Sequence, residues 1–164
     1  MSFLNIQKMK YIVDGSDVGR YFEYLDRIGD KLPTRTREFV LHPEHYGISN
    51  DKGLHDSWVE SVCLNEESTG DRHQIRMLHL VVKLLGPCHD GFHEIVYRDV
   101  QRYSLNLRRT VRSRTARIGH GDWIIDEVLL TRTGFVSHEV LFSDSGIWKI
   151  VCADIEYRWI PKPN

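Results

Sequence analysis

Between residues 16 and 32, apolar side chains recur at steps of three and four: Val18, Phe22, Leu25, Ile28 and Leu32. This spacing places them on one face of a predicted helix. Ser16 can cap the start of that helix, and Pro33 ends it. The segment before it, 1–13, can form a short strand. We expect the apolar face of the helix to pack on a sheet; binding of a partner is the alternative.

From residue 36 the hydrophobic period changes to two, which is typical of β-strands. The predicted strands are 36–42, 58–64, 74–85, 93–107, 123–130, 136–142 and 147–159. The centre of 74–85 is apolar on both faces, so we expect this strand in the middle of a sheet. A slip of register near Asp99 indicates a β-bulge. In the last strand, the residues from Val151 to Trp159 alternate between a buried face and a solvent face.

These elements predict a single α+β domain over residues 1–164. We expect a mainly antiparallel β-sheet of about six to eight strands, with one N-terminal helix packed on it. The length of 164 residues and a hydrophobic content of 41% suit one globular core. Apolar runs are too short for a membrane span or a signal peptide, so we expect a cytoplasmic protein without membrane contact.

The cysteine content agrees with that location. Cys63, Cys88 and Cys152 are odd in number and have no metal-binding or redox spacing. Three free thiols in a reducing compartment are the natural interpretation.

Histidines raise the question of a metal site. His89 and His93 are four residues apart, and His55 and His120 could add further ligands. That spacing brings two imidazoles together on a helix, whereas Gly91 favours a turn that leads into a strand. We therefore predict no metal and no other cofactor. A metal-dependent enzyme or small-ligand binder built on these histidines is the alternative function.

Catalytic motifs are missing from the sequence. It contains no Gly-X-Ser-X-Gly elbow and no glycine-rich phosphate loop that opens a helix. Ser57 and Cys88 lie close to histidines in sequence, but neighbours on a strand point to opposite faces. We predict no catalytic residue, and the chain favours a non-enzymatic function without excluding an enzyme.

Positive charge is concentrated in one segment. Between residues 98 and 117 the local balance is +6, and the rest of the chain, which has a net charge of −1, carries −7. The predicted protein-binding residues are Arg108, Arg109, Arg112, Arg114 and Arg117. They could instead pair with acids of the same molecule or bind nucleic acid as a third function. Because stacking aromatics are missing from 104–122, we favour a protein partner with an acidic surface.

A hydrogen-bonding triplet, His55-Asp56-Ser57, precedes the strand at Trp58. Asp and Ser side chains commonly bond nearby backbone amides and so fix a loop. We interpret the triplet as a structural motif; a direct functional contact is the alternative.

Four sequence features resemble a known group of proteins: Leu54-His55-Asp56-Ser57, Tyr97-Arg98-Asp99-Val100, the hairpin from His138 to Gly146, and Asp154-Ile155-Glu156-Tyr157. The chain resembles, over roughly residues 54–159, small bacterial β-rich domains of the Leu-His-Asp-Ser type, some of which are immunity proteins of polymorphic toxin systems. The segments 1–42 and 108–117 depart from that pattern.

This resemblance implies a bacterial, cytoplasmic immunity protein that binds and occludes a cognate toxin domain. Such a function needs neither a cofactor nor turnover. The resemblance also implies that the arginines face an acidic region of the toxin.

Overall fold

The computed structural model describes residues 3, 15–46, 51–107 and 119–163; the expected strand at 1–13 lies outside this part of the chain except for Phe3. Two α-helices, one 3-10 helix and eight strands form within it. The elements are α1 (Gly15–Ile28), η1 (Gly29–Lys31), α2 (Thr34–Val40), β1 (Trp58–Thr69), β2 (Ile75–Leu85), β3 (Gly91–Arg98), β4 (Arg102–Leu105), β5 (Trp123–Leu130), β6 (Val136–Phe142), β7 (Ile147–Cys152) and β8 (Asp154–Pro161).

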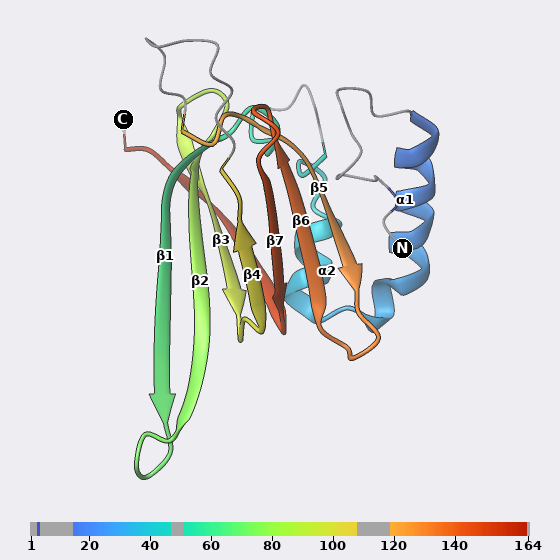
Figure 1. The fold of residues 1–164 in the computed structure, drawn as a ribbon. Coiled ribbons are helices and arrows are strands. Elements are labelled where there is room, and N and C mark those ends of the chain that lie inside the picture. Colours follow the sequence, from blue (N-terminus) through green and yellow to red (C-terminus); the bar gives the residue numbers. More distant parts are fainter. Residues whose placement is uncertain (1–2, 4–14, 47–50, 108–118, 164) are drawn as a thin grey trace.

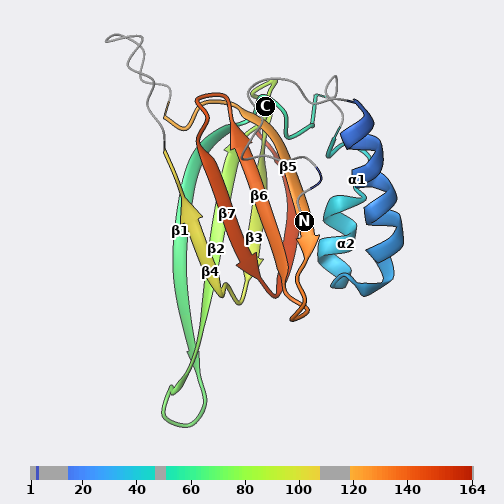
Figure 2. The same cartoon turned by 45° about the vertical axis from the view of Figure 1, so that its right-hand side comes forward.

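The strands form two antiparallel sheets that pack face to face (Figures 1 and 2). One sheet has the order β1-β2-β3-β8, and the other has the order β4-β7-β6-β5. Apolar side chains from both sheets are buried in one core, among them Leu80 of β2, Ile95 of β3 and Trp148 of β7. The β1–β2 hairpin is longer than the other strands and extends beyond the body of the molecule (Figure 1).

Both helices lie at one side of the sandwich, beside two of its four edge strands, β5 and β8 (Figure 2). The hydroxyl of Tyr21 in α1 accepts a hydrogen bond from the backbone N–H of Val128 in β5, at 2.7 Å. The hydroxyl of Thr36 in α2 accepts one from the N–H of Ile155 in β8, at 2.9 Å. The helices therefore occupy hydrogen-bonding groups that an edge strand would otherwise expose.

The predicted fold class is confirmed: the protein is α+β, mostly antiparallel β, with an N-terminal helix. The central placement of the predicted strand 74–85 is also confirmed, because β2 lies between β1 and β3. Its inner face is fully buried at Leu80, Val82 and Leu84. None of the helices in the described ranges is both long and apolar enough to cross a membrane.

The strand predicted at 36–42 is wrong, because α2 occupies these residues. Thr36, Phe39 and Val40 are buried, and their steps of three and four form one helical face. Pro33 ends the 3-10 helix and lies just before the first turn of α2, where its missing N–H costs nothing. Seven residues are too few to distinguish the strand period of two from the helical period of 3.6.

Two predicted strands are each split between the sheets. Residues 93–107 divide into β3 and β4 at Asp99, whose φ of 49° is left-handed, so the expected bulge is a full break. Residues 147–159 divide into β7 and β8 at Ala153. The predicted alternation holds in β8, but in β7 it is Cys152 that points into the core. At each break the chain passes from one sheet to the other.

Candidate functional site

The predicted binding arginines, Arg108, Arg109, Arg112, Arg114 and Arg117, lie outside the described residues. The described chain stops at Leu107, just after β4, and resumes at Gly119 before β5. These arginines therefore remain a prediction.

The triplet His55-Asp56-Ser57 forms a tight turn before β1. Asp56 has a left-handed φ of 63°, and its N–H donates to the carbonyl of Trp123 at 2.9 Å. The N–H of Trp123 donates to the carbonyl of Ser57 at 2.9 Å, and the Ser57 hydroxyl donates to the carbonyl of Gly53 at 3.3 Å. His55 Nδ1 lies 3.2 Å from the Asp56 carboxylate. Through these contacts the turn joins the start of β1 to the start of β5.

The four histidines considered as metal ligands have separate surroundings. His89 packs against Trp58, His120 packs against Trp148, and His55 faces Asp56. His93 is buried, with Nδ1 3.0 Å from the hydroxyl of Tyr157. Burial, together with the nearby charge of His45, lowers the pKa of His93 to about 4. Within the described ranges, no three His, Cys, Asp or Glu side chains are placed to hold a metal ion.

A second polar cluster, which the sequence analysis missed, lies in the core around Asp126 of β5. Its carboxylate accepts hydrogen bonds from His45 Nε2 at 2.9 Å, from His138 Nε2 at 3.0 Å and from the indole N–H of Trp123 at 3.1 Å. His138 Nδ1 in turn lies 2.9 Å from the hydroxyl of Tyr97 in the opposite sheet. The Asp126 cluster therefore connects both sheets to the segment that follows α2.

Each ring nitrogen of His45 faces an acceptor atom. Its Nε2 faces the carboxylate of Asp126, and its Nδ1 lies 2.9 Å from the carbonyl oxygen of Phe39. Both partners accept hydrogen bonds, so a ring with hydrogen on both nitrogens satisfies both of them. Burial alone would raise the pKa of Asp126, but the charge of His45 and the hydrogen bonds from His138 and His45 hold that pKa well below its usual range. The pair is a buried salt bridge.

An acid with two histidines and a tyrosine resembles a catalytic arrangement, but this one is closed. The side chains of His45, Asp126 and His138 are between 0% and 2% exposed. A substrate could reach them only if the core opened. The Asp126 cluster is therefore a structural tie between elements and supplies no accessible acid or base.

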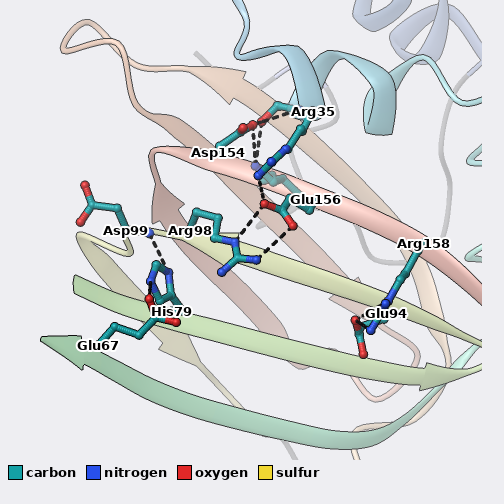
Figure 3. A network of polar contacts seen from close by, with 11 residues as sticks. Arg35, Glu67, His79, Glu94, Arg98, Asp99, Asp154, Glu156 and Arg158 are labelled. Carbon is teal, nitrogen blue, oxygen red and sulfur yellow. Dashed lines mark hydrogen bonds and ion pairs between the residues drawn. The ribbon is translucent and has the colours of Figure 1, made fainter. Parts of the chain in front are cut away.

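The accessible polar network lies on the outer face of the other sheet and beside α2 (Figure 3). Glu156 of β8 accepts a two-pronged contact from Arg98 of β3, at 2.9 and 3.1 Å, and also pairs with Arg35 of α2. Two residues further along β8, Arg158 pairs with Glu94 at 2.6 Å. Planar two-pronged pairs fix the position of a guanidinium better than a single contact does.

The same network anchors α2 and the turn after β3. Asp154 accepts hydrogen bonds from the N–H and the hydroxyl of Thr36, at 3.0 and 2.7 Å. On the same face, toward the β1 edge of the sheet, His79 accepts a hydrogen bond from the N–H of Asp99 at 3.3 Å and lies 3.4 Å from Glu67 (Figure 3). The polar side chains of this face therefore form a row that runs across the strands of the sheet, from α2 to β1.

Two adjoining hollows follow β8, with volumes of about 440 and 210 Å³. We call them together the β8 groove. Its lining residues come from α2, β3, β8 and the segment after α2: Arg35, Glu38, Phe39, His42, Glu94, Val96, Arg98, Glu156, Tyr157, Arg158 and Trp159. The floor is partly aromatic, since the rings of Phe39 and Tyr157 lie 5.8 Å apart and His42 meets Tyr157 edge-on at 5.3 Å.

The arginines of the β8 groove are more exposed to solvent than the carboxylates with which they pair. The side chains of Arg35, Arg98 and Arg158 are 59%, 40% and 68% exposed, whereas their partners Glu156 and Glu94 are 24% and 18% exposed. The carboxylates thus hold the guanidinium groups from below and leave much of each guanidinium surface open.

Comparison with known proteins gave no relative: no family model, curated protein or solved structure matches the chain.

Only part of the β8 groove could be predicted from the sequence. The alternation of Asp154, Glu156 and Arg158 correctly predicted a wet face of the last strand. Nothing in the sequence placed Arg35 beside Glu156, because the two are separated by 121 residues and the expected strand at 36–42 would have oriented Arg35 differently.

Proposed function

We propose that this protein is a non-enzymatic protein-binding domain, and that it acts in the bacterial cytoplasm as an immunity protein that occludes a cognate toxin. The observation that carries the proposal is the β8 groove, an open surface in which exposed arginines surround aromatic side chains. The resemblance of residues 54–159 to Leu-His-Asp-Ser-type domains gives the partner its class.

The composition of the β8 groove suits a protein partner. Arginine, tyrosine and tryptophan are enriched among residues that dominate binding energy at protein interfaces. Arg98 and Arg158 are already held by carboxylates, so binding loses less side-chain entropy than it would with free arginines. A pocket for a small molecule is usually enclosed and mostly apolar, whereas this groove is open and lined by charges.

Non-enzymatic function is supported by the distribution of titratable groups. The acid and histidines with catalytic potential, around Asp126, are shut in the core. At the surface, Glu94 and Glu156 are occupied by arginines. Occlusion of a toxin needs only a complementary surface, and this requires no group with an unusual pKa.

The test is coexpression of the chain with the toxin domain encoded beside it, with cell survival and binding affinity as readouts. Wild type should restore survival and bind the toxin directly. Replacing Arg35 and Arg158 with Gln should weaken binding about tenfold or more, because a truncated hot-spot residue costs at least about 1–2 kcal/mol. The fold should tolerate the change, since exposed ion pairs contribute about 0–1 kcal/mol each.

A control is Arg132→Gln in the turn between β5 and β6, which removes one positive charge away from the groove and is compared with Arg35→Gln and Arg158→Gln made singly. It should bind like wild type. Failure of the wild-type protein to bind or neutralise the toxin would reject the proposed function. Wild-type affinity of the Arg35 and Arg158 variant would place the interface elsewhere on the chain.

A further inference from the structure

The edge of β1 is the long sheet edge that no other described strand covers. β1 is 12 residues long and pairs with β2 along one side. On its other side, a single bridge joins Trp58 to Asp122, and no described strand continues the pairing. The register of β1 shifts between Val59 and Ser61, so the regular open edge runs over 61–69.

The other edges are treated differently. The N–H groups of Val128 and Leu130 in β5 bond to tyrosine hydroxyls of α1, at 2.7 and 2.8 Å. The N–H of Ile155 in β8 bonds to Thr36 of α2. β4, the fourth edge, is only four residues long. Short edges and covered edges resist the addition of strands, and β1 has neither form of protection.

Side chains on β1 make this edge chemically selective. Three acids, Glu60, Glu66 and Glu67, lie on the strand, and 58–69 contains no lysine or arginine. All three are exposed, and Glu67 lies 3.4 Å from His79. Leu64 is exposed as well, at 48%. An added strand would meet apolar side chains at 62–64 and acidic side chains at 66 and 67.

Pairing of β1 with a second copy of itself is disfavoured by the same acids. In an antiparallel pair of two 61–69 edges, centred on Asn65, Glu66 of each chain would be the diagonal same-face neighbour of Glu66 of the other. Like charges that neighbour each other across strands are destabilising. A strand that carries lysine or arginine would instead gain from each glutamate while its backbone uses the open hydrogen-bonding groups.

We propose that the outer edge of β1, over 61–69, binds an extended, positively charged segment of the partner protein as an added β-strand. This inference rests on the proposed function only in taking the partner to be a protein. Backbone hydrogen bonds supply affinity, and Glu66 and Glu67 select for basic side chains. The interaction is separate from the β8 groove, because β1 and β8 are the opposite edges of one sheet.

The direct test uses a synthetic peptide of alternating lysine and valine and amide hydrogen exchange of the full chain. Every second amide of 61–69, those not bonded to β2, should exchange at least about tenfold more slowly with the peptide. A peptide with glutamate in place of lysine tests charge. A third peptide, with the same net charge but with proline in place of valine, cannot form a strand ladder and tests backbone pairing.

The inference is supported if amide exchange slows only in β1, and only with the lysine–valine peptide among the three. Unchanged exchange in β1, or equal slowing by the proline peptide, overturns it. A variant gives a second readout: Glu66→Lys should weaken peptide binding at least about fivefold. Glu23→Lys on α1 changes the net charge equally but lies on an exposed part of the helix away from β1, so it should bind like wild type.

The outcome is distinguishable from that of the proposed function. Full neutralisation of the toxin by the Glu66→Lys variant would overturn the role of β1 and leave the proposed function standing. Strand-type protection of β1 by the basic peptide, without any neutralisation of the toxin, would support the β1 inference and reject the immunity function.

Discussion

Asp126 holds a negative charge where water does not reach it. Three hydrogen-bond donors surround its carboxylate, and one of them, His45, brings a compensating positive charge. A buried charge is tolerated only when it is both paired and hydrogen-bonded, and the cluster meets both conditions. Because the partners come from several elements, this single residue links the sheets to the segment after α2.

Asp126→Asn should therefore destabilise the fold strongly. The amide of asparagine has one acceptor oxygen, and its NH₂ group would face a histidine N–H. We expect the free energy of unfolding at pH 7 to fall by about 3–5 kcal/mol, as when one partner of a buried pair is removed. Urea denaturation measures it. Asp71→Asn at the exposed tip of the β1–β2 hairpin should change it by less than about 0.5 kcal/mol.

The destabilisation caused by Asp126→Asn should also depend on pH. The pKa of Asp126 in the folded protein lies below its ordinary value of 3.8, so its contribution is fully present above about pH 4. It is lost as the pH falls through the folded-state pKa. The difference in unfolding free energy between wild type and Asp126→Asn should consequently shrink between about pH 4 and pH 2. A difference that stays constant over that range would contradict the ionised pair.

The burial of β2 changes along its length. β2 is covered on its inner face in its second half, but its first half projects with β1 into the long hairpin. Leu64 of β1 and Leu80 of β2 face each other in register, yet Leu80 is fully buried and Leu64 is 48% exposed. The pair therefore marks where the hairpin leaves the core.

Substituting these two leucines tests that boundary. Leu80→Ala should lower the free energy of unfolding by about 2–5 kcal/mol, because it leaves a cavity in the core. Leu64→Ala, the same change at the facing position, should cost less than about 1 kcal/mol. Thermal or urea denaturation of both variants gives the comparison. Equal losses would show that the hairpin is packed along its whole length.

The sequence predicted the existence of most elements better than their ends. Residues 74–85 and 136–142 were predicted within one residue, because their apolar stretches are bounded by turns. The breaks at Asp99 and Ala153 were not predictable as changes of sheet. A bulge and a crossover give the same local slip of period, and only packing between the sheets decides between them.

Charge is distributed unevenly over the whole molecule, since 98–117 carries +6 and the remainder −7. Part of this positive charge is paired, as Arg98 shows with Glu156. Reversing Arg112 and Arg114 to Glu should leave stability within about 1 kcal/mol of wild type. It should slow association with the proposed protein partner, and the loss should shrink as salt rises.

Stopped-flow association rates at two salt concentrations measure this effect. A double reversal that unfolds the protein would show that these arginines are paired inside the molecule. An unchanged association rate would leave the β8 groove and the β1 edge as the binding surfaces.

The β8 groove could be predicted only in part because it combines residues that are distant in sequence. Arg35 comes from α2, Arg98 from β3 and Glu156 from β8. The sequence identified each as polar and exposed. Their meeting depends on β8 pairing with β3 and on α2 lying along β8, and neither contact leaves a local pattern in the sequence.

The docking of α2 on β8 also fixes the order of events as the chain leaves the ribosome. Thr36 is synthesised 118 residues before its partner Asp154. Helices as short as α2 are barely stable alone in water, and α2 lacks its contacts with β8 during that interval. Both the sheet and the helical side of the sandwich are completed by the same last strand. The described fold is therefore completed only after β8 has been translated, so the docking of α2 cannot precede the synthesis of the strand it packs on.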